Sequence, residues 1–164
     1  MVATPCYIKN ISASNTASAI TGVKNMFVKY LDQMHAIRER ILDLRQDVRE
    51  NKDGVFYNVE LTIIVEDFNN LNILLNDDLK LYDQAIPYLD LRLLREYVNQ
   101  GQIEKAEKLS NQWYTATHEL IEYYRELDYS RAVLYLEKCV TVFHYPIYIL
   151  LMLKDLKTLN AIAA

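Results

Sequence analysis

The sequence predicts an all-α fold: an elongated antiparallel bundle of five or six helices, led by a long N-terminal αα-hairpin. Two observations carry this prediction. Glycine and proline each occur only three times in 164 residues, so the chain lacks the frequent turns of a β sandwich. Apolar residues also recur at alternating steps of three and four along two long segments, the spacing of helices with one buried face. We expect a single helical domain over residues 17–164, preceded by an irregular segment over residues 1–16.

The longest apolar pattern covers residues 23–50. Its positions alternate by four and three residues, and they are Val23, Phe27, Tyr30, Met34, Ile37, Ile41, Leu44 and Val48. Nearly four heptads of this kind predict one helix about 42 Å long. A compact domain of this size is roughly 40 Å across, so we expect the helix to reach across the whole molecule. Gly54 is the expected left-handed cap after it.

Residues 55–65 are ambiguous between strand and helix. Apolar side chains occupy every second position there, as in a strand. A heptad pattern fits a longer stretch, through Tyr57, Leu61, Ile64, Phe68, Leu71 and Leu75, and a lone strand would have no partner. We therefore predict a second helix, antiparallel to the first, that completes a hairpin over residues 17–86. The poor helix formers at 76–78 are expected to interrupt this helix.

Smaller helices are expected over residues 87–164. Pro87 suits the first turn of a helix, because its missing N–H would be unpaired there, and residues 99–101 (Asn-Gln-Gly) end that helix. The next helix runs through Trp113 and Leu120 to a turn at residues 128–130. Pro146 is expected to begin a terminal helix.

Composition and charge favour a protein of the cytoplasm or of a soluble assembly such as a virion. The formal net charge is −4, which lacks the overall basic character of nucleic-acid-binding domains. Cys6 and Cys139 fit no disulfide framework or metal-binding spacing. The N-terminal region lacks a continuous apolar stretch, and the apolar stretch at residues 140–153 is too short to span a bilayer.

Catalytic patterns are scarce, and we expect neither an enzyme nor a bound cofactor or metal. The isolated Gly22, Gly54 and Gly101 form no phosphate-binding loop. No His follows a Glu at the spacing that di-iron bundles use. His118 and Glu122 share a helix face and are interpreted as an exposed polar pair. Cys139 and His144 lie in an apolar segment and are expected to be packed.

The leading hypothesis is a non-catalytic structural protein, a helical subunit of a larger homo- or hetero-oligomer such as a filament, a capsid or a multisubunit complex. The heptad stripe is longer than a small core requires, and thirteen tyrosines suit protein interfaces. The predicted partners are other copies of the chain or other protein subunits. The predicted interface residues are Phe27, Tyr30, Met34, Ile37, Ile41 and Leu44.

Two alternatives remain open. Arg38, Arg45, Arg49 and Lys52 lie along one side of the first helix, where they would contact the phosphates of a nucleic acid. The competing interpretation of these four residues is pairing with the acidic helices that follow. The second alternative is an adaptor that holds a partner helix in a groove near residues 94–127.

Overall fold

The chain folds as an all-α helical bundle. The computed structural model describes residues 16–52, 56–87 and 91–163. Over these residues it contains helices and connecting turns and no strand. The helices are α1 (Thr16–Arg49), α2 (Tyr57–Leu79), the short 3₁₀ helix η2 (Lys80–Tyr82), α3 (Leu91–Asn99), α4 (Ile103–Glu126) and α5 (Ser130–Ala163). The irregular segment predicted before Thr16 and the cap predicted at Gly54 lie outside the described residues.

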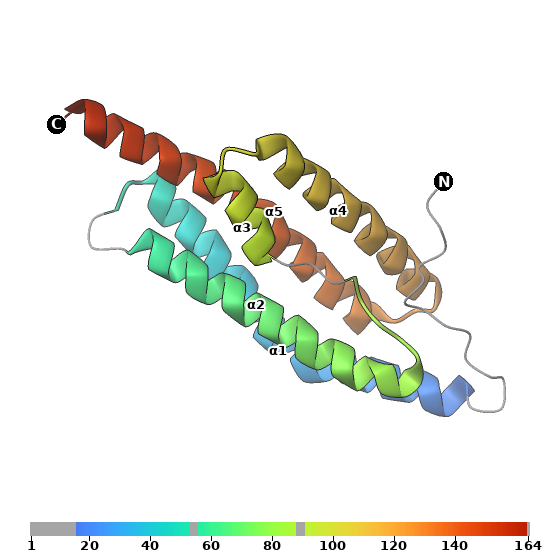
Figure 1. The fold of residues 1–164 in the computed structure, drawn as a ribbon. Coiled ribbons are helices and arrows are strands. Elements are labelled where there is room, and N and C mark those ends of the chain that lie inside the picture. The colour runs from blue at the N-terminus through green and yellow to red at the C-terminus, as the bar shows by residue number, and fades with distance from the viewer. Residues whose placement is uncertain (1–15, 53–55, 88–90, 164) are drawn as a thin grey trace.

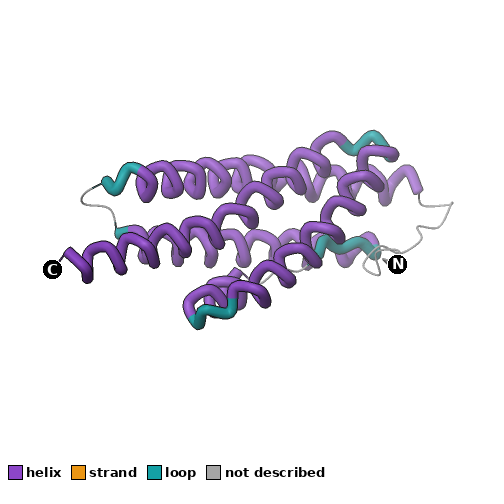
Figure 2. Tube along the Cα trace, turned by 90° about the horizontal axis from the view of Figure 1, so that it is seen from above, coloured by secondary structure: helices purple, strands orange, loops and turns teal. Residues whose placement is uncertain are grey.

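The bundle is elongated and is built from two antiparallel pairs (Figures 1 and 2). In Figure 1, α1 and α2 lie along the lower side of the bundle, α4 lies at the upper right, α5 runs from the centre to the upper left, and α3 lies between α2 and α4. The α1/α2 pair is antiparallel because Lys29 contacts Asp78 near one end and Arg40 contacts Asp67 nearer the other. The segment over residues 55–65 is therefore helical from Tyr57 onward, as predicted.

The central pair, α1 and α5, runs parallel, which differs from the wholly antiparallel bundle that the sequence predicts. Phe27 meets Tyr135 near the start of both helices, with ring centroids 5.7 Å apart. Further along, the Arg45 guanidinium lies 4.8 Å from the ring centroid of Tyr145. Each helix has 34 residues, so α5 covers α1 along much of its length (Figure 1).

The same capping arrangement ends α1, η2, α3 and α4. In each case one residue has a positive φ, and two backbone N–H groups turn back to the last carbonyls, which defines a Schellman motif. The residues with positive φ are Asn51, Asp83, Gly101 and Asp128. At α1, for example, the Lys52 N–H donates to the Asp47 carbonyl at 3.1 Å. The cap that the sequence assigned to Gly54 is thus formed by Asn51.

Two predicted helix boundaries are wrong. The helix α2 continues through residues 76–78, because their polar side chains bond to other segments instead of to their own backbone. The Asn76 side chain accepts a hydrogen bond from the Ile86 N–H at 2.7 Å, and Asp78 accepts one from Tyr30 at 2.6 Å. Pro146 does not begin a helix but lies inside α5 and is buried. Buried Phe143 and Ile149 on either side of it keep the helix packed against its neighbours.

One described helix is long and apolar enough to cross a membrane by length and composition alone. It is the Ser130–Leu153 part of α5, with a mean hydropathy of 1.4. The same segment is a central helix of this bundle, where Tyr135, Leu136 and Val142 are buried. A core helix of a folded domain satisfies the same criterion of length and composition.

Candidate interaction surface

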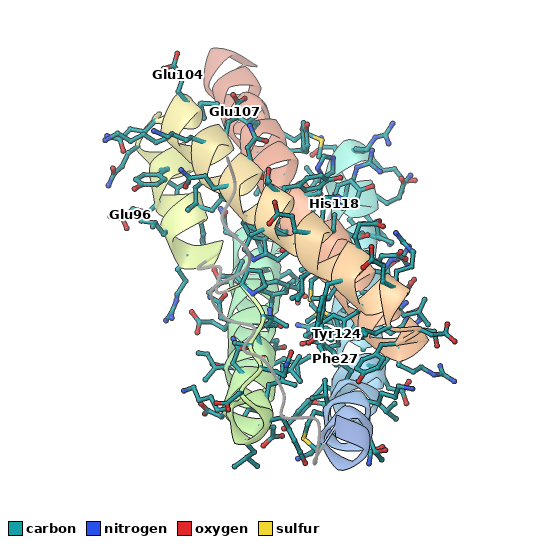
Figure 3. The ribbon with its side chains drawn as sticks, turned by 90° about the vertical axis from the view of Figure 1, so that its right-hand side faces the viewer. Phe27, Glu96, Glu104, Glu107, His118 and Tyr124 are labelled. Atoms are coloured by element: carbon teal, nitrogen blue, oxygen red, sulfur yellow. The ribbon has the colours of Figure 1, made fainter. Side chains whose placement is uncertain are left out.

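The six residues predicted to contact a second protein lie in the core of the single chain. Their exposed fractions lie between 0% and 6% for Phe27, Tyr30, Met34, Ile37, Ile41 and Leu44. Phe27 packs edge-on against Tyr124 of α4 at 5.2 Å, and the two residues lie close together in Figure 3. As placed here, these six are core residues and present no surface to a partner. An interaction surface has to be built from other side chains.

The four basic residues predicted to contact phosphates lie on α1 and, in the case of Lys52, just after its end. Three of them interact within the chain. The Arg38 guanidinium donates to Glu39 at 2.7 Å, and Lys52 lies 3.8 Å from Asp47, so both pair within their own segment. Arg45 stacks on Tyr145, and Arg49 is exposed. The alternative pairing of these four with the acidic helices is not seen among the described contacts.

Exposed apolar side chains follow the outward side of α2. They recur at helical spacing, opposite the face that packs against α1. We call them the outer α2 stripe, which consists of Phe56, Val59, Ile63, Ile73, Leu74 and Leu81. Phe56 is 76% exposed and Leu81 79% exposed. Scattered exposed apolar residues are normal, but clusters of them mark an interaction site more often. The stripe consists of two such clusters, one at Phe56, Val59 and Ile63 and one at Ile73, Leu74 and Leu81.

The outer α2 stripe explains why residues 55–65 resemble a strand. The helix buries Leu61 and Val65 on its inner side, whereas Val59 and Ile63 face outward. Two apolar faces on one helix fill every second position locally, which imitates the period of a strand. Sequence reasoning treated this alternation as a problem of secondary structure. It was also the signal of a second apolar face that the core does not use.

Charges beside the outer α2 stripe are paired within the chain. Arg40 of α1 donates to Asp67 at 2.6 Å, and Arg92 of α3 lies 3.8 Å from Glu66. The Arg40–Asp67 pair lies in a shallow groove of about 320 Å³ between α1 and α2, which Leu74 also lines. The face therefore combines apolar side chains with neutralised carboxylates, which is typical of a protein-binding surface.

A hydrogen-bonded cluster fixes the C-terminal end of α2 against α1. The Tyr30 hydroxyl donates to Asp78 at 2.6 Å, and Lys29 lies 3.3 Å from the same carboxylate oxygen. Mainly because of the Tyr30 hydrogen bond, the pKa of Asp78 is lowered below its usual value of 3.8. The contact with Tyr30, followed by that with Asp78, raises the pKa of Lys29, and the hydrogen bond to Asp78 raises the pKa of Tyr30. The cluster holds the stripe's C-terminal half in place.

The outward face of α4 is polar and acidic. Glu104, Glu107 and His118 lie along it in Figure 3, and two open hollows of about 600 and 590 Å³ follow the same side. His118 is exposed, as predicted, and its ring lies 4.3 Å from that of Tyr114. Among the described residues, no three His, Cys, Asp or Glu side chains meet as a metal site requires.

The remaining predicted positions divide between core and surface. Cys139 is buried, as predicted, and burial raises the pKa of its thiol. The prediction that His144 is packed is wrong, because His144 is exposed beside the rings of Tyr145 and Tyr148. In the region predicted to hold a partner helix, Leu94 and Leu120 are buried within the chain.

Comparisons of the chain with protein-family models, with curated proteins and with solved structures found no match.

Proposed function

We propose that this chain is a non-catalytic assembly protein, a helical subunit that joins a larger oligomer through the outer α2 stripe. The observation that carries the proposal is an exposed apolar row on a helix whose opposite face already completes the core. These exposed apolar side chains do not contribute to the core of the single chain. Another protein surface would remove them from water.

The energy available from this stripe is of the right order for association. Full burial of one large aliphatic or aromatic side chain contributes about 1.5–3 kcal/mol. Phe56 and Leu81 are more than three quarters exposed, and Val59 and Leu74 are about half exposed. Several such side chains together offset much of the translational and rotational entropy that association costs. Four of the six stripe residues lie within α2, and Phe56 and Leu81 lie just before and just after it, so little further ordering is needed.

The test is the size of the native particle that contains the chain. In a gentle extract of cells that make the protein, we expect it to elute well above the monomer mass of 19.2 kDa. The double variant Val59→Lys/Leu74→Lys should shift it toward the monomer, because both substitutions place a charge on the stripe. Lysine is a good helix former, so α2 itself should remain intact.

The matched control is Tyr114→Lys on α4 combined with Leu134→Lys on α5, whose side chains are 40% and 41% exposed and belong to helices other than α2. This variant should elute with the wild type. Equal elution of all three proteins at the monomer mass, or equal loss of the large particle in both variants, would contradict the proposal.

A second candidate function is binding of a single-stranded nucleic acid beside the C-terminal half of α1. The specific observation is that Arg45 stacks on Tyr145 next to the exposed rings of His144 and Tyr148. Exposed aromatic rings beside guanidinium groups suit base stacking together with phosphate contacts.

A salt series tests this second candidate. A fluorescent single-stranded RNA should bind at low ionic strength and dissociate steeply as salt increases. The variant Arg45→Gln/Arg49→Gln should bind several-fold more weakly, whereas the control Lys108→Gln on the acidic face of α4 should bind as the wild type does. No binding at low salt would rule out this function.

A further inference from the structure

The two flanks of α1 differ in how their positive charges are neutralised. On the flank that faces α2, Lys29 pairs with Asp78 and Arg40 pairs with Asp67. Every charged residue within α2 is acidic, so this helix supplies the carboxylates that the α1 cations need. The α2 flank of α1 is therefore electrostatically balanced within the fold.

The flank of α1 that faces α5 carries cations as well, but α5 does not supply the carboxylates. Arg38, Arg45 and Arg49 recur on this flank at steps of seven and four residues. The Arg45 guanidinium lies over the ring of Tyr145, and the Lys138 ammonium contacts α1 on the same flank. Cations from two helices thus border one surface. We call it the α1/α5 seam, which consists of Arg38, Arg45, Arg49, Lys138, Tyr145 and Tyr148.

Acidic residues border the seam without lying on it. Glu137 of α5 faces α4, where it pairs with Arg125. The acidic residues of the same stretch of α1 lie on its exposed outermost side, and they are Glu39, Asp43 and Glu50. Of the four seam cations, only Arg38 has a carboxylate partner among the described contacts, Glu39 at 2.7 Å. The other three cations can therefore pair with an anion from outside the chain.

Aromatic rings lie at the C-terminal end of the seam. Tyr148 is 50% exposed, and its ring centroid lies 5.1 Å from that of the exposed His144. Tyr145 next to them carries the Arg45 guanidinium. Cations beside exposed rings match a single-stranded nucleic acid, which presents both phosphates and unstacked bases. An acidic peptide would use the cations but not the rings.

We infer that a single-stranded nucleic acid lies along the α1/α5 seam, with its phosphates beside Arg45, Arg49 and Lys138. A base stacks on the exposed ring of Tyr148. This inference rests on the second candidate function and extends its site to another helix, because Lys138 belongs to α5. The parallel pairing of α1 with α5 brings the two halves of the site together.

The salt dependence of binding tests the phosphate contact of Lys138. Wild type and Lys138→Gln are titrated with a fluorescent oligouridylate at a series of salt concentrations. Each phosphate contact on a single strand contributes about 0.7 to the slope of log K against log salt concentration. Lys138→Gln should therefore reduce the slope by about 0.7 and weaken binding several-fold at low salt.

The matched control is Lys80→Gln, which changes the net charge equally. Lys80 pairs with Asp77 beside α2, so this variant should bind as the wild type does. If the wild type binds and the two variants have equal slopes, the inference is wrong, whereas the second candidate function stands on Arg45 and Arg49. If the wild type does not bind at low salt, both are wrong.

Substitutions at Tyr148 test the stacked base. Tyr148→Leu should weaken binding several-fold and leave the salt slope unchanged, because the ring carries no charge. Tyr148→Phe retains the ring and should bind as the wild type does. Circular dichroism checks that both variants keep the helix content of the wild type. A polyglutamate peptide with the same number of charges as the oligouridylate should bind more weakly. If it binds as tightly and Tyr148→Leu affects neither ligand, the seam binds acidic protein segments and the inference is wrong.

Discussion

At the scale of single residues, the core is held in register by a few buried polar groups. The Tyr135 hydroxyl of α5 donates to the Asn72 side chain of α2 at 2.7 Å. The Tyr124 hydroxyl of α4 donates to the Gln84 side chain at 3.1 Å. Burial raises the pKa of both tyrosines, so the hydroxyls keep their protons and remain donors over the whole ordinary pH range. Each of these bonds links segments that are far apart in the sequence.

Replacing Tyr135 with phenylalanine should lower the free energy of unfolding by about 1–2 kcal/mol, because the buried Asn72 carbonyl loses its donor. Urea denaturation followed by circular dichroism measures this change. The control is Tyr148→Phe, which removes the hydroxyl of a half-exposed tyrosine and should change stability by less than about 0.5 kcal/mol. Equal effects of the two variants would contradict a structural role for the Tyr135 hydroxyl.

Asp78 should contribute to stability in a pH-dependent manner. Its pKa is lowered in the folded chain, chiefly by the Tyr30 hydrogen bond, so the stabilisation is present above the unfolded value of 3.8 and is lost as the pH falls through the folded value. Asp78→Asn should therefore be less stable than the wild type near neutral pH, and the difference should shrink below about pH 4.

Urea denaturation of wild type and Asp78→Asn at a series of pH values measures this difference. Asp77→Asn is the control, because Asp77 is exposed and pairs only with the nearby Lys80 among the described contacts. A stability difference for Asp78→Asn that stays constant from neutral pH to pH 3 would contradict the assigned cluster.

At the scale of the helices, left-handed residues decide where each one ends. Asn51, Asp83, Gly101 and Asp128 hold positive φ angles of 49°, 54°, 76° and 61°. Only one of the four is glycine, the residue that adopts this conformation without strain. Sequence reasoning anticipated the ends near Gly101 and Asp128. It placed the left-handed cap after α1 at Gly54 and not at Asn51, because Asn is a weaker signal for such a cap than glycine.

Exchanging residues at two of these caps should change stability in opposite directions. Gly101→Ala should lower the free energy of unfolding by about 1 kcal/mol, because φ is positive there. The space around the added Cβ is open, so the loss comes from the backbone conformation and not from a steric clash. Asp128→Gly should raise it by a few tenths of a kcal/mol to about 1 kcal/mol. Thermal denaturation of both variants checks the prediction. A loss of stability in Asp128→Gly would show that its side chain matters more than its backbone conformation.

The helices themselves were largely predictable because apolar periodicity identifies the buried face of each. All eight positions of the stripe over residues 23–50 are buried, as are Leu61, Ile64 and Phe68 of α2. The partner of each face was not predictable. Periodicity shows that a face is covered but not by which helix, so the stripe that α5 covers was interpreted as an interface between copies. The surface of α2 was missed because its apolar residues were counted toward secondary structure.

At the scale of the whole molecule, the two antiparallel pairs share one core. Phe27 of α1 contacts both Tyr124 of α4 and Tyr135 of α5. The single tryptophan, Trp113 of α4, packs on Phe143 of α5 at 4.6 Å and donates to the Pro87 carbonyl. A destabilising substitution at one point of this core should therefore lower the stability of all the helices together.

Phe27→Ala should lower the free energy of unfolding by about 3–5 kcal/mol, because it leaves a cavity where three helices meet. Helix content, followed by circular dichroism, and Trp113 fluorescence should shift to lower urea concentration together. The neighbouring Val28→Ala, at a position 52% exposed, should change little. If the two signals separate in Phe27→Ala, the α1/α2 and α4/α5 pairs unfold independently.

The parallel contact of α1 with α5 also governs how the chain acquires its structure during translation. The helix α1 leaves the ribosome well before α5 is made, so in the interval its apolar stripe is covered only in part, by α2 and, at Phe27, by Tyr124 of α4. The α1/α5 interface joins residues more than a hundred positions apart, and such distant contacts slow folding. A nascent chain with this topology carries a partly uncovered stripe until α5 has been made, which makes it a natural client for chaperones that shield apolar helices.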